Sequence, residues 1–263
     1  LVGPMIRNAA ALIERGMPLI ACFSSYLGTT DNITKGRDLH VGDLAHGVVP
    51  PISHVGDLVP VMAGCALGFK LSNQRQVALT YTGDGSTATG AVHEGLRMAA
   101  ALKAPFICVI QDNQVALGTR AEVHNSGNFS AYGDAYGTHL IEMDGNNVLD
   151  CYAAGQEAVD LCRAGQGPVI IVARTFRMGG HATHDEREAR ALFDDDVYAY
   201  WGKRDPVGMY ETWLLQEKGI DASTLEAIEA KALDAIESAA NEANARRDSH
   251  QPDPGTQTEG VYA

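Results

Sequence analysis

Asp84 and Asn113 carry oxygen atoms that suit a divalent metal ion, and each lies shortly after an apolar stretch of the chain. Val77–Tyr81, shortly before Asp84, is typical of a short β-strand, and Phe106–Ile110, shortly before Asn113, is a fully apolar second strand. A carboxylate and an amide oxygen together suit a hard cation that keeps other coordination sites for phosphate and water. The first chemistry that the sequence suggests is therefore an oxygen-ligated metal site.

The segment between these two residues predicts how they come together. Gly90–Leu102 has apolar residues at helical spacing, so a helix links the two strands. A right-handed crossover brings the ends of both strands to one edge of the sheet. Gly83 and Gly85 allow a sharp turn and a close approach to a ligand. Ser86 and the residues after it are expected to open a helix, whose free N–H groups favour a diphosphate.

A simpler interpretation is that Gly83-Asp84-Gly85 is only a turn, because this tripeptide is common. The strand before it, the helix after it and Asp112-Asn113 behind the next strand favour a ligand site. The segment is not a nucleotide-binding fingerprint, because the third glycine is absent at the required spacing and no Lys-Ser/Thr pair follows.

Further elements extend the same alternation of strands and helices. Thr138–Met143 and Pro168–Ala173 are predicted to be strands, and Val148–Arg163 is predicted to be a helix between them. This rhythm predicts an α/β fold with a mostly parallel sheet and helices on both of its faces. Ligands of such folds bind at the carboxyl ends of the strands.

The remaining segments are less regular. Leu27–Pro51 is expected to be a long loop, and Gly179–Arg190 a polar, mobile one. Asp57–Leu71 is a predicted helix of small residues. Asp205-Pro206 is typical of a helix start with proline at the first helical position. Ser223–Glu226 predicts a capping box at the start of a further helix.

The composition excludes several classes of function. A net charge of −13 argues against nonspecific binding of nucleic acid backbones. The five cysteines are odd in number and far apart, which fits reduced thiols in a cytoplasmic compartment. No apolar stretch approaches the roughly 20 residues that span a bilayer. The first twenty residues carry Arg7, Glu14 and Arg15, so they are not expected to be a signal peptide.

The segment from Gly83-Asp84-Gly85-Ser86 to Gln111-Asp112-Asn113 resembles the thiamine diphosphate motif, which opens with Gly-Asp-Gly and closes with a paired Asn. More specifically, the chain is similar to the α subunit of the first, decarboxylating component of 2-oxo acid dehydrogenase complexes of the pyruvate, branched-chain or acetoin type. The similarity runs from Leu1 to the closing Gly260–Ala263, and it implies that a further family segment precedes Leu1.

The resemblance implies a three-layer thiamine-diphosphate-binding fold. We expect a single domain over residues 1–263, with a core of about 1–220, a C-terminal helix over 221–247 and a tail over 248–263. The cofactors implied are thiamine diphosphate and Mg²⁺.

The resemblance also implies the metal ligands. Asp84 and Asn113 would ligate Mg²⁺ by their side chains, and Val115 by its backbone carbonyl. Leu117 matches the bulky residue that helps to hold the cofactor bent. Gly83, Gly85 and Ser86 belong to the same motif and are therefore expected to contact the cofactor; the residues implied at this end are Gly83, Asp84, Gly85, Ser86, Asn113, Val115 and Leu117.

Other implied contacts come from distant parts of the chain. Ser53 and Val55 match the backbone positions that hydrogen-bond the aminopyrimidine, and Arg7 falls on the diphosphate-binding arginine. Arg177 and His181 match the ends of the active-site loop, whose histidine lies near the thiazolium and the phosphates. We expect His181 to act as a hydrogen-bond donor and proton-transfer group at the substrate.

The match departs from the family pattern at several positions. Ile6 replaces a frequent Tyr, which removes one hydroxyl contact with the diphosphate. Asp112 replaces the first Asn of the usual pair, and Val115 replaces a frequent Tyr or Phe. Gln111 replaces the Arg of branched-chain relatives. Ala182 replaces the serine that is phosphorylated in mitochondrial relatives, so that regulation is not expected.

Two other functions remain open at this point. His181, His184 and Asp185 have the types of residue that bind zinc or iron, which would suit a metallohydrolase. The departure at Ile6 also leaves open a cofactor-binding or assembly subunit that does not catalyse.

The resemblance finally implies partners that complete the reaction. A β subunit in an α₂β₂ assembly would supply the activating glutamate, and a dihydrolipoyl acyltransferase would receive the acyl group of a small 2-oxo acid on its lipoyl arm. The small residues of Asp57–Leu71 suit close packing against that β subunit, although packing inside one domain would use them equally well.

Overall fold

The computed structural model describes residues 1–125, 127–256 and 258–259. The chain divides into two compact units. The first contains Leu1 and Ile52–Gly219, and the second contains Val2–Pro51 and the described residues from Ile220 onward. The single domain expected from the sequence stays a prediction, and the closing Gly260–Ala263 lies outside the described residues.

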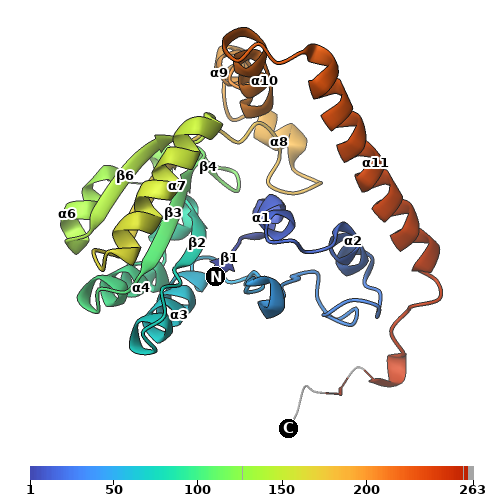
Figure 1. The fold of residues 1–263 in the computed structure, drawn as a ribbon, viewed down its shortest axis with the longest axis horizontal. Coiled ribbons are helices and arrows are strands. Elements are labelled where there is room, and N and C mark those ends of the chain that lie inside the picture. The colour runs from blue at the N-terminus through green and yellow to red at the C-terminus, as the bar shows by residue number, and fades with distance from the viewer. Residues whose placement is uncertain (126, 257, 260–263) are drawn as a thin grey trace. The chain divides into compact units, whose positions relative to one another are not determined.

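The first unit is built on a parallel sheet (Figure 1). Its strands follow the order β2-β3-β7-β6, and each neighbouring pair is parallel. The register places Ala78 beside Phe106, Ile107 beside Val169 and His139 beside Val169. The strands of this sheet are β2 (Ala78–Gly83), β3 (Phe106–Asp112), β6 (His139–Asp144) and β7 (Val169–Arg174).

The connections between these strands run in two directions. Helix α4 (Gly90–Ala101) leads from β2 to β3, and α7 (Val148–Arg163) leads from β6 back to β7. Crossovers between parallel strands are right-handed as a rule, so two crossovers that run in opposite directions place their helices on opposite faces of the sheet. The order therefore reverses between β3 and β7, and parallel sheets bind ligands at such a reversal.

The two central strands, β3 and β7, are apolar and buried along most of their length because both of their faces are covered. Ile107 and Val109 of β3 pack with Ala158 and Cys162 of α7 in one cluster. The intervening Phe106, Cys108 and Ile110 point the other way and are also fully buried. This pattern is the one expected for a strand with helices on both faces. The α/β fold with a mostly parallel sheet is confirmed.

The shorter elements of the first unit surround this sheet. Helix α3 (Leu58–Leu71) packs against α4 and β2. A two-stranded hairpin, β4 with β5, follows β3. The remaining elements of this unit are η3 (Gly85–Ala88), β4 (Val115–Ala116), β5 (Thr119–Arg120), α5 (Ala121–His124), η4 (Phe129–Ala131), α6 (Tyr132–Tyr136), α8 (Glu186–Arg190), α9 (Asp195–Gly202) and α10 (Pro206–Glu217).

The second unit is mostly helical. Its core contains Leu12, Met17, Val41 and Val48, and α11 packs against α2. Its elements are β1 (Val2–Gly3), η1 (Ile6–Asn8), α1 (Ala9–Glu14), α2 (Leu19–Leu27), η2 (Leu44–His46), α11 (Ala222–Arg246) and η5 (Pro254–Thr256).

Several predicted element boundaries are wrong. Ser86 lies inside the 3₁₀ turn η3, and the α-helix begins only at Gly90. The capping box at Ser223 does not form, because α11 already begins at Ala222 with Asp221 before it. The polar loop over 179–190 ends in a short helix, α8. Of the helices in the described residues, none has the length and apolar content needed to cross a bilayer.

Candidate active site

A single carbonyl oxygen brings the two predicted side-chain metal ligands together. The backbone N–H of Asp84 donates to the carbonyl oxygen of Gln111 over 3.2 Å, and the N–H of Asn113 donates to the same oxygen over 3.0 Å. Gly83 is the register partner of Gln111, so β2 and β3 end at the same level. The backbone therefore turns Asp84 and Asn113 out of neighbouring strands at one point of the sheet edge.

These oxygen donors lie in a buried environment. Asp84 is 2% exposed and Asn113 is 5% exposed. Burial, and next the nearby charge of Asp84, raise the pKa of the Asp112 carboxyl above its usual range. A buried carboxylate is costly unless a cation or hydrogen bonds compensate its charge. The donor set and its negative charge thus fit a divalent ion.

The Gly-Asp-Gly turn is held tightly against the hairpin that follows β3. A Cβ atom on Gly85 would overlap the Cβ of Ala116 in β4, so only glycine fits there. The Ser86 hydroxyl donates to the carbonyl oxygen of Gly83 over 2.7 Å and lies 2.6 Å from the hydroxyl of Thr82. Gly83, Gly85 and Ser86 therefore shape the turn that presents Asp84.

The β4–β5 hairpin places the other two residues predicted near the cofactor. The N–H of Val115 donates to the side-chain oxygen of Asn113 over 3.2 Å, which fixes the amide next to the start of β4. Val115 is buried, whereas Leu117 is 63% exposed and has the left-handed φ of 54°. A non-glycine residue at such an angle is uncommon and often marks a functional constraint.

Arg177 joins this hairpin to the chain that leaves β7. Its N–H donates to the carbonyl oxygen of Asn113 over 3.1 Å, and its Nη2 donates to that of Leu117 over 2.7 Å. Its Nε donates to the carbonyl oxygen of Gly179 over 3.0 Å. The structure therefore brings Arg177 together with Asn113 and Leu117, across the point where the strand order reverses.

Ser53 and Val55 approach the same end of the sheet through the glycine that follows them. Gly56 has a φ of +87°, and a Cβ there would meet the Thr89 hydroxyl and approach the carbonyl oxygen of Ser86. The segment before α3 is thus packed against the turn that carries Ser86. Ser53 and Val55 are both exposed.

His181 lies in an exposed loop that two acidic residues hold by its backbone. Both carboxylate oxygens of Asp185 accept N–H groups, from His181 over 2.9 Å and from Ala182 over 2.7 Å. These bonds lower the pKa of Asp185. The Glu186 carboxylate accepts the N–H of Gly180 over 2.5 Å.

This arrangement does not support the metallohydrolase. Asp185 uses its oxygens to cap the loop, and His184 is exposed. Within the described residues, no group of three or more His, Cys, Asp or Glu side chains could hold a metal ion. The candidate site at Asp84 is of a different kind, because it includes an Asn side chain and a backbone carbonyl oxygen.

One residue near Asp84 is not found by the sequence reasoning. His124, the last residue of α5, has its Nε2 atom 3.9 Å from Oδ2 of Asp84, and its side chain is 16% exposed. No signal in the sequence indicates this proximity, because it depends on the path of the β4–β5 hairpin.

Arg7 lies in η1 of the second unit and is exposed. Its predicted contact with the diphosphate stays a prediction.

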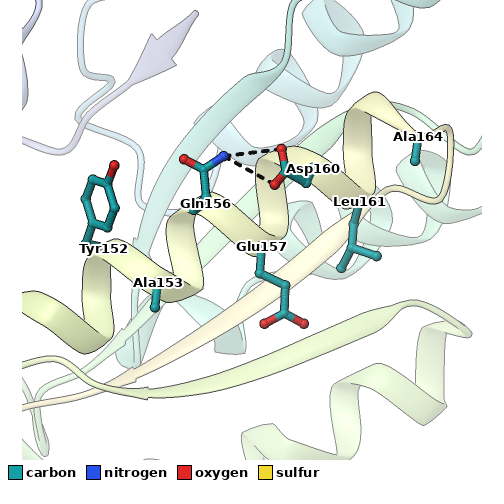
Figure 2. A pocket seen from close by; sticks show the side chains of 7 residues that line it. All are labelled: Tyr152, Ala153, Gln156, Glu157, Asp160, Leu161 and Ala164. Carbon is teal, nitrogen blue, oxygen red and sulfur yellow. Dashed lines mark hydrogen bonds between the residues drawn. The ribbon is translucent and has the colours of Figure 1, made fainter.

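A hollow of about 700 Å³ lies along α7, away from the residues described above. Figure 2 shows that its labelled side chains come from this helix and from Ala164, which directly follows it. Within the helix, the Gln156 amide donates to both carboxylate oxygens of Asp160. No predicted site residue lines it, so it does not suggest a different active site.

The fold is that of an α/β protein with a mostly parallel sheet, and the buried oxygen donors lie at the strand-order reversal, where ligands of such folds bind. The sequence profile of the Dehydrogenase E1 component family matches residues 1–252. The chain therefore belongs to that family.

Individual relatives support the same assignment. The chain is 33% identical over 215 residues to the pyruvate dehydrogenase E1 component subunit alpha of Acholeplasma laidlawii, covering 81% of this chain and 60% of that protein. It is 31% identical over 221 residues to the mitochondrial 2-oxoisovalerate dehydrogenase subunit alpha of Homo sapiens, with 82% and 49% covered. For the pyruvate dehydrogenase E1 component subunit alpha of Bacillus cereus, the identity is 31% over 224 residues, with 85% and 58% covered. The chain spans about half the length of the curated relatives it matches.

Proposed function

We propose that this chain is the α subunit of a thiamine-diphosphate-dependent 2-oxo acid dehydrogenase. The observation that carries the proposal is the shared hydrogen bond to Gln111, which sets Asp84 and Asn113 side by side in a buried site. The family assignment and the names of the relatives support the same reaction class.

In this proposal, Asp84, Asn113 and the carbonyl of Val115 hold a divalent metal ion, Mg²⁺ in the simplest case, that anchors the cofactor diphosphate. Oxygen donors of this kind suit an ion that also binds phosphate. The turn from Gly83 to Ser86 would approach the diphosphate, and Arg7 would add a positive charge to it. Ser53 and Val55 would bind the aminopyrimidine by their backbones.

Thiamine diphosphate supplies the electron sink that a 2-oxo acid needs in order to lose carbon dioxide. The chain itself supplies binding, orientation and proton movement. Leu117, held by the Arg177 guanidinium, would support the bent cofactor from one side. His181 would donate a hydrogen bond to the substrate and move a proton there, because an imidazole titrates near neutral pH.

A β subunit is proposed to complete the site by supplying the glutamate that activates the cofactor. The outer face of α3 supports such a partner, because Val61, Gly64, Gly68 and Leu71 are exposed along it. Ala63 and Ala66, two other small residues of this helix, are instead buried. The acyl group would then pass to the lipoyl arm of a dihydrolipoyl acyltransferase. All five cysteines are free, which supports a reducing, cytoplasmic location.

Reconstitution tests this function. The full-length protein, mixed with its β subunit, thiamine diphosphate and Mg²⁺, should reduce an artificial electron acceptor when a short 2-oxo acid is added. Asp84→Asn should abolish this activity and the Mg²⁺-dependent binding of thiamine diphosphate measured by calorimetry. Asp134→Asn, on the exposed side of α6, serves as the matched control.

Three outcomes are distinguishable. Turnover that depends on Asp84 supports the proposal. Cofactor binding without turnover of any short 2-oxo acid would support the non-catalytic binding subunit instead. Turnover that survives Asp84→Asn would place the metal elsewhere and contradict the site.

A further inference from the structure

The candidate metal site has a nitrogen donor beside its oxygen donors. Nε2 of His124 lies 3.9 Å from Oδ2 of Asp84. This nitrogen is buried, and it makes no hydrogen bond to any residue that the structure describes. The separation exceeds the distance of a hydrogen bond, so the two atoms are not joined by one directly.

That separation suits two ligands of one ion. Donors bound at about 2.0–2.1 Å to the same octahedral ion are about 3.0 Å apart when adjacent and about 4.2 Å apart when opposite. The observed 3.9 Å lies between these two values and nearer the one for opposite ligands. Oδ1 of Asp84 accepts the N–H of Gly85 over 2.9 Å, so Oδ2 is the oxygen on the His124 side of the carboxylate.

The placement of His124 follows from the same hairpin that carries Val115. After β5 the chain enters α5, and the N–H of Ala121 donates to the carbonyl oxygen of Gln114 over 2.8 Å. This bond closes the hairpin and directs α5 toward η3, which follows Asp84. The imidazole is therefore positioned by backbone bonds between residues adjacent to the proposed ligands.

We propose that His124 is a direct ligand of the metal ion that anchors the cofactor. The inference rests on the proposed function, since it assumes that Asp84 binds that ion. Oxygen ligands suit Mg²⁺ and Mn²⁺ alike, whereas an imidazole nitrogen favours first-row transition ions. The site accordingly prefers Mn²⁺ or Co²⁺ to Mg²⁺.

Pulsed electron paramagnetic resonance on Mn²⁺ tests the nitrogen ligand directly. The full-length protein in complex with its β subunit is loaded with Mn²⁺ and thiamine diphosphate, once unlabelled and once with ¹⁵N-histidine. We expect the Mn²⁺ spectrum to show the modulation of a coordinated imidazole nitrogen, and we expect the isotope to change it. The modulation should be absent in His124→Gln and retained in His139→Gln. His139 is an exposed histidine of β6 and gives the matched control.

A competition titration supplies a second readout. His124→Gln should lower the preference for Mn²⁺ over Mg²⁺ by about tenfold or more, a size typical of altered metal surroundings. A protein that binds Mn²⁺ and cofactor without nitrogen modulation would overturn the role of His124 and leave the proposed function intact. A protein that binds neither Mn²⁺ nor cofactor would instead overturn the proposed function itself. Because the wild-type spectrum decides the ligand, the test does not depend on the folding of the variant.

Discussion

The loops that follow β3 and β7 leave neighbouring strands, yet they are held in different ways. After β3, Asn113 and Val115 are buried. The N–H of Asn113 donates to the carbonyl oxygen of Gln111, its carbonyl oxygen accepts the N–H of Arg177, and its side-chain oxygen accepts the N–H of Val115. After β7, the chain reaches the exposed His181, which is held by carboxylates only a few residues further along. We call these segments the metal loop (Gln111–Leu117) and the histidine loop (Gly179–Asp185).

The two loops therefore differ in what fixes the positions of their residues. The metal loop takes its geometry from the sheet, because the register of β2 and β3 fixes the positions of Asp84 and Asn113 relative to each other. The histidine loop takes its geometry from local capping, which contributes little stability and tolerates movement. In the proposed function, these two constructions would provide a rigid anchor for the cofactor and an adjustable group at the substrate.

The largest expected effect comes from breaking the metal loop at its closest contact. Gly85→Ala places a Cβ atom on the Cβ of Ala116, so the hairpin must move away from the turn. Overpacking of this kind costs about 1–3 kcal/mol of stability. We expect a lower melting temperature and a loss of cofactor affinity of about 100-fold or more, measured by calorimetry.

Gly118→Ala is the matched control, because a Cβ at Gly118 meets no atom within 4 Å. If Gly85→Ala bound the cofactor as tightly as Gly118→Ala, the close packing of the turn against the hairpin would be irrelevant to the site.

The next effect tests the link between the two loops. Arg177 donates through Nη2 to Leu117 and through Nε to Gly179, so one guanidinium serves both segments. In Arg177→Lys a single ammonium cannot reproduce this planar arrangement of donors. We expect kcat to fall about tenfold, since one hydrogen bond from a charged group contributes about 1.5–3 kcal/mol.

Cofactor affinity should change much less in Arg177→Lys, because the ligands of the metal loop remain in place. Arg174→Lys, an exposed residue at the end of β7, provides the control. Equal losses in kcat and in cofactor affinity would show that Arg177 belongs to the metal loop alone.

A smaller effect follows from removing the cap of the histidine loop. Asp185→Ala deletes the acceptor for the N–H groups of His181 and Ala182. Hydrogen exchange at these two amides should become several-fold faster, while exchange in β3 stays unchanged. The melting temperature should hardly change, because the loop is exposed and local.

The same carboxylate predicts a pH dependence. Backbone N–H groups of Ala182 and His181 lower the pKa of Asp185 below its ordinary 3.8. A lowered pKa stabilises the loop above the ordinary value and loses that effect as pH falls through the lowered one. Amide protection, corrected for intrinsic exchange, should therefore persist at pH 5 and fall below pH ~3.8. Protection independent of pH across this range would contradict the capping role.

The contrast between the loops also explains what the sequence could predict. Alternating apolar runs gave β3 and α7 nearly residue by residue, and the crossover rule brought Asp84 and Asn113 together. The position of His124 depends on a hairpin of two-residue strands and on a short helix. Elements this short show no periodic pattern of apolar residues from which they could be predicted. The predicted helix start at Ser223 is wrong because Asp221 is an equally good N-cap residue, and the helix begins after this earlier one.

The smallest effect on function is expected at the N-cap of α7, where a side chain accepts backbone N–H groups, as Asp185 does, but only stabilises the fold. Asn147 ends the segment after β6, and its side-chain oxygen accepts the N–H groups of Leu149 and Asp150 at the start of α7. Asn147→Ala should cost about 0.5–2 kcal/mol of unfolding free energy, measured by urea denaturation. Asn147→Ser restores an acceptor and should recover most of that loss. Cofactor affinity and kcat should stay near wild type in both variants, because α7 supports the sheet from a face that holds no proposed ligand. A fall in kcat with unchanged stability would show instead that the carboxyl end of β6 takes part in the site. Residues positioned by the sheet and residues positioned by local capping would then not have separate roles.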